Sequence, residues 1–200
     1  MNPRLLIYMV KKLAQWSPGC KVVPVSAVTE GAACTVLLAR EFIDNDDALM
    51  IANSDQWVDV AIDDYLLSMD NAHADGWIMT MTANDPKWSF LRFDDQQNII
   101  EVVEKEVVSN EATVGIYNFA KGSDFVRAAD DMIAKDFRVK GAFYVAPVYN
   151  GLVAENKKIG YFTIGSEADG MYGLGIPEDL VLFESLPIKQ KALAIVSRSE

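Results

Sequence analysis

Apolar segments of strand-like length alternate with amphipathic segments along this 200-residue chain, and this alternation limits its fold more than any other feature. Strands are predicted at 21–25, 48–53 and 76–82, with helices at 29–42 and 61–69 between them. Strands that alternate with helices in this way form a largely parallel sheet that is covered by helices on both faces. We therefore expect an α/β fold.

The second half of the chain adds a β-hairpin to this pattern. Residues 89–93 and 99–104 are β-rich and are separated by a short polar turn, so they predict a hairpin inserted against the α/β unit. The remaining predicted elements are strands at 113–119 and 158–164 and helices at 5–16, 123–134, 141–155 and 177–186. No repeat or linker interrupts the sequence. We expect a single domain over residues 1–200, in which 186–200 form a C-terminal extension.

Composition excludes several classes of function. The chain has 18 Lys and Arg residues against 29 Asp and Glu, a net charge of −11, which argues against binding to nucleic acid, because such binding depends on clustered basic residues. Cys20, Cys34 and His73 are the only cysteines and histidine, too few for a four-ligand Cys/His zinc site. No segment approaches the roughly 18 apolar residues of a membrane helix. We expect a cytoplasmic protein with free thiols and no membrane partner.

A carboxylate follows directly after the apolar strand at 48–52. Ligands of open α/β sheets bind at the carboxyl ends of the strands, and Asn53-Ser54-Asp55 occupies such a position. Asp55 is therefore placed to hold Mg²⁺, which prefers oxygen ligands and commonly keeps substrate phosphates among them. The alternative is that Asp55 only caps the turn or the next helix, which is a common use of aspartate.

A second candidate site lies at the end of strand 99–104. There Glu104 is placed to bind a sugar hydroxyl and Lys105 to bind a phosphate. Gly115, in the next strand, allows a ligand to approach the backbone closely. The alternative is a solvated charge pair followed by an ordinary strand glycine, and residue type and spacing alone favour this alternative.

Five short segments, taken in order, resemble the sugar-phosphate nucleotidyltransferase family. They are Thr29-Glu30-Gly31-Ala32-Ala33, Ala52-Asn53-Ser54-Asp55, Val103-Glu104-Lys105, Gly115-Ile116-Tyr117-Asn118-Phe119 and Gly175-Ile176-Pro177-Glu178-Asp179-Leu180. The resemblance implies a Rossmann-like three-layer α/β/α fold of the glycosyltransferase-A type, with a mostly parallel mixed sheet. It also implies transfer of a nucleoside monophosphate from a nucleoside triphosphate to a sugar 1-phosphate or similar phosphate, with release of pyrophosphate, in cell-surface polysaccharide metabolism.

The same resemblance implies roles for individual residues. Asp55 would be a catalytic residue and the Mg²⁺ ligand near the triphosphate, and Lys105 would be a catalytic residue that holds the acceptor phosphate. The other substrate-binding residues would be Gly31 under the nucleotide base, Asn53, Glu104 on the sugar and Gly115 in the acceptor pocket. An acceptor phosphate oxygen is already nucleophilic at neutral pH, so the chemistry needs in-line positioning and charge neutralisation rather than a general base.

Two departures from the family pattern change the expectation for this chain. The family's first strand, its glycine-rich loop with an Arg and its Pro-Lys pair, which together grip the triphosphate, have no counterpart in the sequence. Gly173 stands where many members have a second acidic metal ligand, for which Asp169 and Glu178 are the candidate substitutes. We expect an N-terminally incomplete domain that is inactive by itself and forms homo-oligomers through uncovered strand edges. The alternatives are a non-catalytic sugar-phosphate-binding or assembly subunit and a glycosyltransferase of the same fold.

Overall fold

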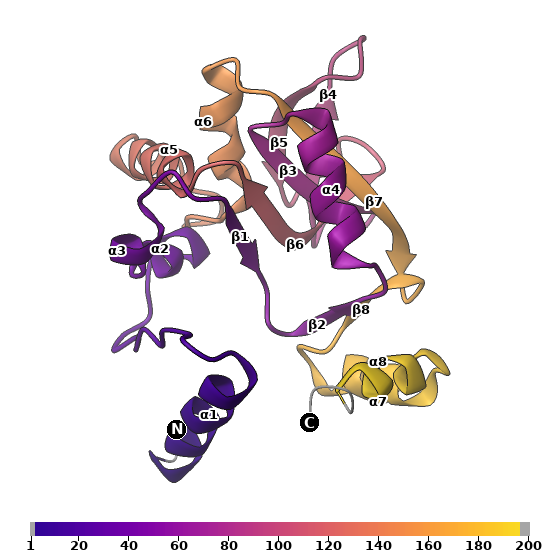
Figure 1. Cartoon of the computed structure of the whole chain (residues 1–200). Coiled ribbons are helices and arrows are strands. Elements are labelled where there is room, and N and C mark those ends of the chain that lie inside the picture. Colours follow the sequence, from indigo (N-terminus) through magenta and orange to yellow (C-terminus); the bar gives the residue numbers. More distant parts are fainter. Residues whose placement is uncertain (1–2, 197–200) are drawn as a thin grey trace. The chain divides into compact units, whose positions relative to one another are not determined.

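The computed structural model describes residues 3–196, which form two compact units. The first unit takes in the described residues before Thr29 and after Leu186, and the second is Thr29–Leu186. The second unit ends where the predicted C-terminal extension begins. It contains the whole described sheet, so the site is built on this unit (Figure 1).

The second unit is organised around an eight-stranded sheet with the order β2-β8-β7-β3-β6-β4-β5, and β1 pairs separately with β6. The strands are β1 (Leu49–Ala52), β2 (Gln56–Val58), β3 (Gly76–Thr82), β4 (Ser89–Phe93), β5 (Ile99–Glu104), β6 (Glu111–Phe119), β7 (Ile159–Glu167) and β8 (Gly170–Gly173). The predicted hairpin is present as β4 and β5. Strands predicted at 48–53, 76–82 and 113–119 are also present, within two residues at each end.

Among the described strands, β6 has the largest number of pairing partners, because it pairs with β1, β3 and β4. β3 pairs along one edge of β6, while β4 and β1 share the opposite edge, β4 at Ala112 and β1 opposite 116–119. All three pairs are antiparallel, and within residues 3–196 only β3–β7 and β7–β8 are parallel. The sheet is mixed, as predicted, but it is more antiparallel than predicted, because β6 runs back from the hairpin into its middle.

Helices cover both faces of the sheet, which confirms the predicted three-layer α/β/α fold (Figure 1). One face carries α2 (Ala32–Leu37), α3 (Arg40–Ile43), α5 (Gly122–Ala134), the 3₁₀ helix η1 (Ala146–Val148) and α6 (Tyr149–Ala154). Its core includes the buried rings of Tyr117, Phe119, Phe125 and Tyr149. The other face carries α4 (Ile62–Ala72), whose fully buried Tyr65 packs in a second core with Met79 and Phe90. The helix α7 (Pro177–Ser185) follows β8.

Three predicted elements differ in the structure. The helix predicted at 141–155 begins only at Ala146, as η1 followed by α6, because Ala142 forms a bridge with Val139 and Phe143 pairs with the segment before α2. Residues 21–25 form no strand, because an apolar pattern becomes a strand only where another strand pairs with it, and none does so in the described chain. The helix predicted at 29–42 is divided into α2 and α3 and starts later, at Ala32. Its first residues are drawn instead into backbone pairing with Phe143: Phe143 N donates to Glu30 O at 2.9 Å, and Ala33 N donates to Phe143 O at 3.0 Å.

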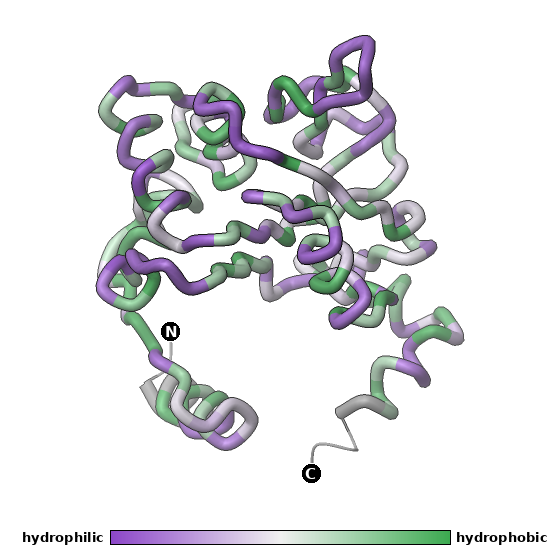
Figure 2. The backbone as a smooth tube through the Cα atoms, turned by 45° about the horizontal axis from the view of Figure 1, so that its top comes forward, coloured by the Kyte–Doolittle hydropathy of each residue, from purple (hydrophilic) through white to green (hydrophobic). Residues whose placement is uncertain are grey.

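The first unit contains the helices α1 (Pro3–Trp16) and α8 (Ile188–Val196). The helix α1 contains both hydrophobic and hydrophilic residues (Figure 2), and Ile7, Leu13 and Trp16 are exposed. Neither helix, nor any other in the part of the chain that the structure describes, is long and apolar enough to cross a membrane.

Candidate active site

A pocket of about 230 Å³ lies in the second unit, on the face of the sheet that carries α2 and η1. It is formed by the ends of β1, β4 and β5 where they meet the middle of β6, and by the segment that leads into η1. Four of the predicted site residues line it: Asn53, Glu104, Lys105 and Gly115. The structure therefore brings together residues that are separated by up to 62 positions in the sequence (53 to 115).

Asn53 and Gly115 form the part of the pocket wall next to β1. Asn53 N donates to Gly115 O at 3.0 Å, and Gly115 has a φ of 78°, in the left-handed region that favours glycine. A Cβ atom on residue 115 would lie 2.3 Å from Asn53 Nδ2, so the Asn53 side chain occupies the space that any larger residue would need. Both the positive φ and the closeness of Asn53 favour glycine at this position.

Glu104 ends β5 and lies opposite Ser89 of β4. The Ser89 hydroxyl donates a hydrogen bond to Glu104 Oε2, which fixes the orientation of the carboxylate. Burial raises the pKa of Glu104, and the Ser89 hydrogen bond and the positive charge of Lys105 offset part of this effect. Oε1 is left to accept a hydrogen bond, so the fixed carboxylate suits a ligand hydroxyl.

Lys105 turns the chain at the end of β5, with a φ of 60° and a hydrogen bond from its N to Trp88 O at 3.0 Å. Its Nζ lies 5.3 Å from the centroid of the Tyr144 ring, within cation–π range. Lys87 also lines the pocket, but its Nζ forms an ion pair with Glu167 Oε1 at 2.7 Å. Lys105 makes no ion pair with any residue in 3–196, so its charge is available to an anionic ligand.

Gly31 lies beside the pocket, whose lining begins at the next residue, Ala32. Its φ is 140°, and a Cβ atom there would lie 2.3 Å from Phe143 O. The glycine thus lets the segment before α2 pack directly on the backbone of Phe143, and it positions both Ala32 and the pocket residue Tyr144. The role of Gly31 under a nucleotide base stays a prediction.

Asp55 lies outside the pocket lining, two residues beyond Asn53. It is exposed, its carbonyl oxygen accepts a hydrogen bond from Leu174 N at 2.8 Å, and its Oδ2 lies 2.8 Å from the position that a Cβ of Gly175 would take. The absence of a side chain on Gly175 therefore keeps the space beside this carboxylate open. Asp55 is held by the pairing of β2 with β8, which begins one residue later.

The carboxylate beside Gly173 belongs to Asp179, in the first turn of α7. Asp179 Oδ2 lies 2.9 Å from the position of a Cβ on Gly173. Neither candidate named from the sequence occupies this place in the contacts of Gly173, and Asp169 lies in the turn between β7 and β8. Among the described residues, no three His, Cys, Asp or Glu side chains form a group suited to a metal ion.

Ser89, Trp88 and Tyr144 are pocket residues that were not predicted from the sequence. Ser89 could have been predicted, since the register of the hairpin places it opposite Glu104. Trp88, whose buried Nε1 has no hydrogen-bond partner among the described residues, precedes the same strand. Tyr144 had no signal, because its place depends on the contact between Phe143 and the segment before α2.

The fold and the pocket define a class: a three-layer α/β protein with a polar small-molecule pocket at the ends of its strands. The profile of the family described as Nucleotidyl transferase matches residues 9–137, well over half of the chain. The chain belongs to the nucleotidyl transferase family, and the resemblance identified from its motifs is confirmed. A search among curated proteins finds no match.

Solved structures of similar fold come from the same area of enzymology. The nucleoside-diphosphate-sugar pyrophosphorylase from Vibrio cholerae RC9 matches with a TM-score of 0.72 and 23% identity, over 91% of this chain and 76% of that one. A putative glucose-1-phosphate thymidylyltransferase from Bacillus anthracis, solved in complex with a sucrose, matches with a TM-score of 0.65 and 17% identity, over 89% and 73% of the two chains. At these identities the likeness establishes the fold.

Proposed function

We propose that the pocket between β1, β5 and β6 binds the acceptor of a nucleotidyl transfer, in which a nucleoside monophosphate moves from a nucleoside triphosphate to a sugar 1-phosphate or similar phosphate. The observation that carries the proposal is that Asn53, Glu104, Lys105 and Gly115 line one pocket and that Asp55 follows two residues after its wall. Membership of the nucleotidyl transferase family supports the reaction class. The name of the Bacillus anthracis neighbour supports glucose 1-phosphate as the first acceptor to test.

Different residues of the pocket bind different parts of the acceptor. Lys105, which has no carboxylate partner in the described chain, binds the acceptor phosphate, and Glu104 accepts a hydrogen bond from a sugar hydroxyl. Both groups sit at the end of the hairpin strand β5, so the acceptor is held between two adjacent residues. A phosphate oxygen of the acceptor then attacks the α-phosphorus of the nucleoside triphosphate, and pyrophosphate leaves. Positioning at Lys105 and Glu104 contributes to the rate by aligning this attack.

The residues around Asp55 fit Mg²⁺. The carboxylates of Asp55 and Asp179 supply hard oxygen donors, and Gly175 and Gly173 leave open the space that side chains would fill beside them. Asp55 would hold the ion. When bound, Mg²⁺ neutralises charge on the triphosphate during phosphoryl transfer.

A second candidate, sugar-phosphate binding without turnover, rests on one observation. Lys87, the other lysine among the described residues that line the pocket, is already paired with Glu167 at 2.7 Å. Charge on a triphosphate would therefore be poorly neutralised, and removal of one such group alone costs about 10²–10³ in rate. We infer that this chain by itself binds the acceptor and releases no pyrophosphate.

In this proposal the protein works in the cytoplasm, in cell-surface polysaccharide metabolism.

Self-association is part of the proposal. Within the described chain β1 pairs only with β6, so the opposite edge of β1 is unpaired, and Met50 on this strand is 46% exposed. Exposed edges of this kind commonly pair with another chain. A homo-oligomer would cover the edge.

Calorimetric titration with glucose 1-phosphate tests acceptor binding, and a pyrophosphate-release assay with the four nucleoside triphosphates and Mg²⁺ tests turnover. We expect saturable binding that weakens at least tenfold in Lys105→Ala and is unchanged in Lys121→Ala, a control lysine that pairs with Asp46 away from the pocket. Equal binding by both variants would overturn the acceptor site. Pyrophosphate release that is lost in Asp55→Ala would instead show that the chain is a complete catalyst.

A further inference from the structure

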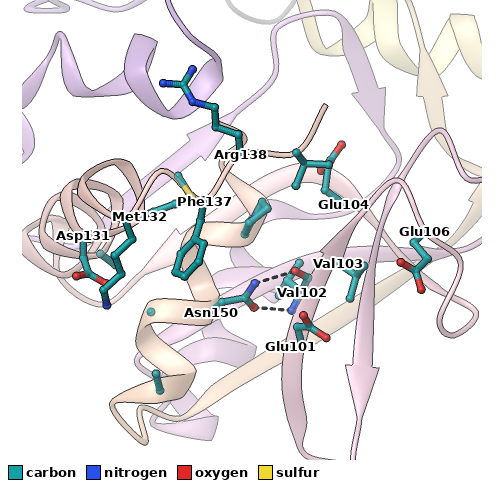
Figure 3. Close-up of a pocket in the computed structure, with 16 residues that line it drawn as sticks. Glu101, Val102, Val103, Glu104, Glu106, Asp131, Met132, Phe137, Arg138 and Asn150 are labelled. Carbon is teal, nitrogen blue, oxygen red and sulfur yellow. Dashed lines mark hydrogen bonds and ion pairs between the residues drawn. The ribbon is translucent and has the colours of Figure 1, made fainter. Parts of the chain in front are cut away.

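A second and larger pocket, of about 540 Å³, lies on the outer side of the edge strand β5. One wall is β5 and the other is the end of α5 with residues 137–139 (Figure 3). The floor comes from η1 and α6. Glu104 is the only residue that lines both this pocket and the candidate acceptor pocket, so the two are separate cavities on either side of the end of β5.

At the floor of this pocket, the side-chain amide of Asn150 pairs with the backbone edge of β5. Asn150 Oδ1 accepts a hydrogen bond from Val102 N at 2.7 Å, and Asn150 Nδ2 donates to Val102 O at 3.0 Å (Figure 3). One carboxamide edge, O=C–N–H, thus satisfies both outward groups of a strand residue. The unpaired edge of a sheet is covered at this point by a side chain.

Glu104 presents the next pair of outward backbone groups along the same edge. Val102 lies opposite Leu91 and Glu104 opposite Ser89, and outward-facing residues alternate along an antiparallel strand, so the N–H and C=O of Glu104 face the same way as those of Val102. Neither group has a hydrogen-bond partner among residues 3–196. The pocket therefore contains a second docking edge of the kind that Asn150 uses at Val102.

Addition of a peptide strand is disfavoured at this edge. An added strand pairs with alternate residues of its neighbour, and its residue opposite Val102 would have to displace the Asn150 carboxamide. A compact ligand that pairs with Glu104 alone meets no such obstacle. The geometry thus favours a small molecule over a peptide.

The wall facing β5 offers an apolar surface for a flat ligand. Phe137 is 66% exposed and, in Figure 3, its ring points into the pocket above Asn150, with Met132 beside it. The charged groups around the pocket are largely neutralised within the protein: Lys135 pairs with Asp131 at 2.6 Å, and Arg138 pairs with Glu30 at 2.6 Å. A neutral ring suits this surface better than an ion.

We propose that this pocket is a binding site for a neutral planar heterocycle with a lactam edge, the chemistry of uracil and thymine. The adjacent O=C–N–H of the ring pairs with Glu104 N–H and C=O as the Asn150 carboxamide pairs with Val102, and the face of the ring packs on Phe137. The site shares Glu104 with the acceptor pocket but uses the backbone of this residue instead of its carboxylate, so it stands or falls separately from the proposed reaction.

Uridine is the probe, and ¹H–¹⁵N NMR of the full chain is the measurement. We expect saturable shifts of the Glu104 and Phe137 amide signals. In 3-methyluridine a methyl group replaces the lactam hydrogen. This methyl group removes the donor and prevents close approach, so both hydrogen bonds are lost. We expect its affinity to be lower than that of uridine by a factor of about ten or more. Phe137→Ala should weaken uridine binding by at least threefold. Phe137 is exposed, so the variant should fold normally, and Phe42→Ala is the matched control for an exposed phenylalanine away from the pocket.

The outcomes separate this site from others that bind uridine. Weaker binding of 3-methyluridine together with an effect confined to Phe137→Ala supports the proposal. Equal affinity for the two nucleosides, shifts centred on Gly31 and Asn53 instead of Glu104 and Phe137, or no saturable shift at millimolar uridine would overturn it. Loss of glucose 1-phosphate binding in Lys105→Ala bears only on the acceptor pocket.

Discussion

Substitution of Gly115 by alanine should damage the pocket through one contact, and a second glycine provides the matched control. Gly115 and Gly141 have similar positive φ values, 78° and 83°. A Cβ on Gly141 would meet nothing within 4 Å, whereas a Cβ on Gly115 would lie 2.3 Å from Asn53 Nδ2 and 2.8 Å from Asn53 Cγ. The difference between the two variants therefore reports the contact with Asn53, free of the backbone strain that they share.

The magnitudes follow from these contacts. Alanine in the left-handed region costs about 1–2 kcal/mol, and the less flexible unfolded chain returns about 0.4–1 kcal/mol, so Gly141→Ala should lose about 0.5–1.5 kcal/mol of unfolding free energy. Gly115→Ala adds an overpacking cost of about 1–3 kcal/mol, at the low end because Asn53 is exposed and can rotate away. We expect a total of about 1.5–2.5 kcal/mol, or a urea midpoint lower by roughly 1 M.

Urea unfolding of the two variants measures this difference, and glucose 1-phosphate titration measures its effect on the pocket. Rotation of Asn53 out of the wall should weaken binding in Gly115→Ala, while Gly141→Ala binds normally. Adding Gly115→Ala to an Asn53→Ala background should lower the unfolding free energy only by the backbone strain, as Gly141→Ala does, because the overpacking against Asn53 is then absent. If Gly115→Ala and Gly141→Ala are equally stable, or if the excess cost persists without the Asn53 side chain, the contact is not the cause and the reasoning fails.

Three further predictions test the metal, the half-buried carboxylate of Glu104 and the strand edge. Mn²⁺ should broaden NMR signals near Asp55 in the wild type and not in Asp55→Ala; equal broadening would remove the assignment. Because burial raises the pKa of Glu104, the native state binds more protons than the unfolded state between the unfolded and folded pKa values, so its contribution to stability falls as pH rises through that window. Thermal unfolding from pH 4 to 7 should show the wild type losing stability relative to Glu104→Gln, and parallel curves would contradict this. Met50→Lys should reduce the mass measured by light scattering, while Ile100→Lys, also an exposed strand position, should not; a monomeric wild type would refute the association.

The sequence alone determined those strands and turns whose residue pattern is complete within a short segment. The hairpin 89–104 is evident from two β-rich segments around a polar turn, and β3 begins and ends at the predicted residues, because its apolar run is bounded on both sides by polar segments. Motif order along the chain likewise identified Glu104, Lys105 and Gly115 before their meeting in one pocket was known. In each case the residue types themselves carry the physical requirement, such as an acceptor oxygen, a positive charge or a positive φ.

Only the tertiary structure decided the rest, because the causes lie far apart in sequence. The strands β2 and β8 are three and four residues long and exist through their pairing with each other, more than 100 positions apart, while residues 21–25 carry a strand pattern and find no partner. The start of α2 is set by the backbone of Phe143, which also brings Tyr144 to Lys105. The carboxylate beside Gly173 comes from Asp179 because α7 folds back on β8. A pattern within one segment contains no information on such partners, since strand pairing and close packing are properties of two segments at once.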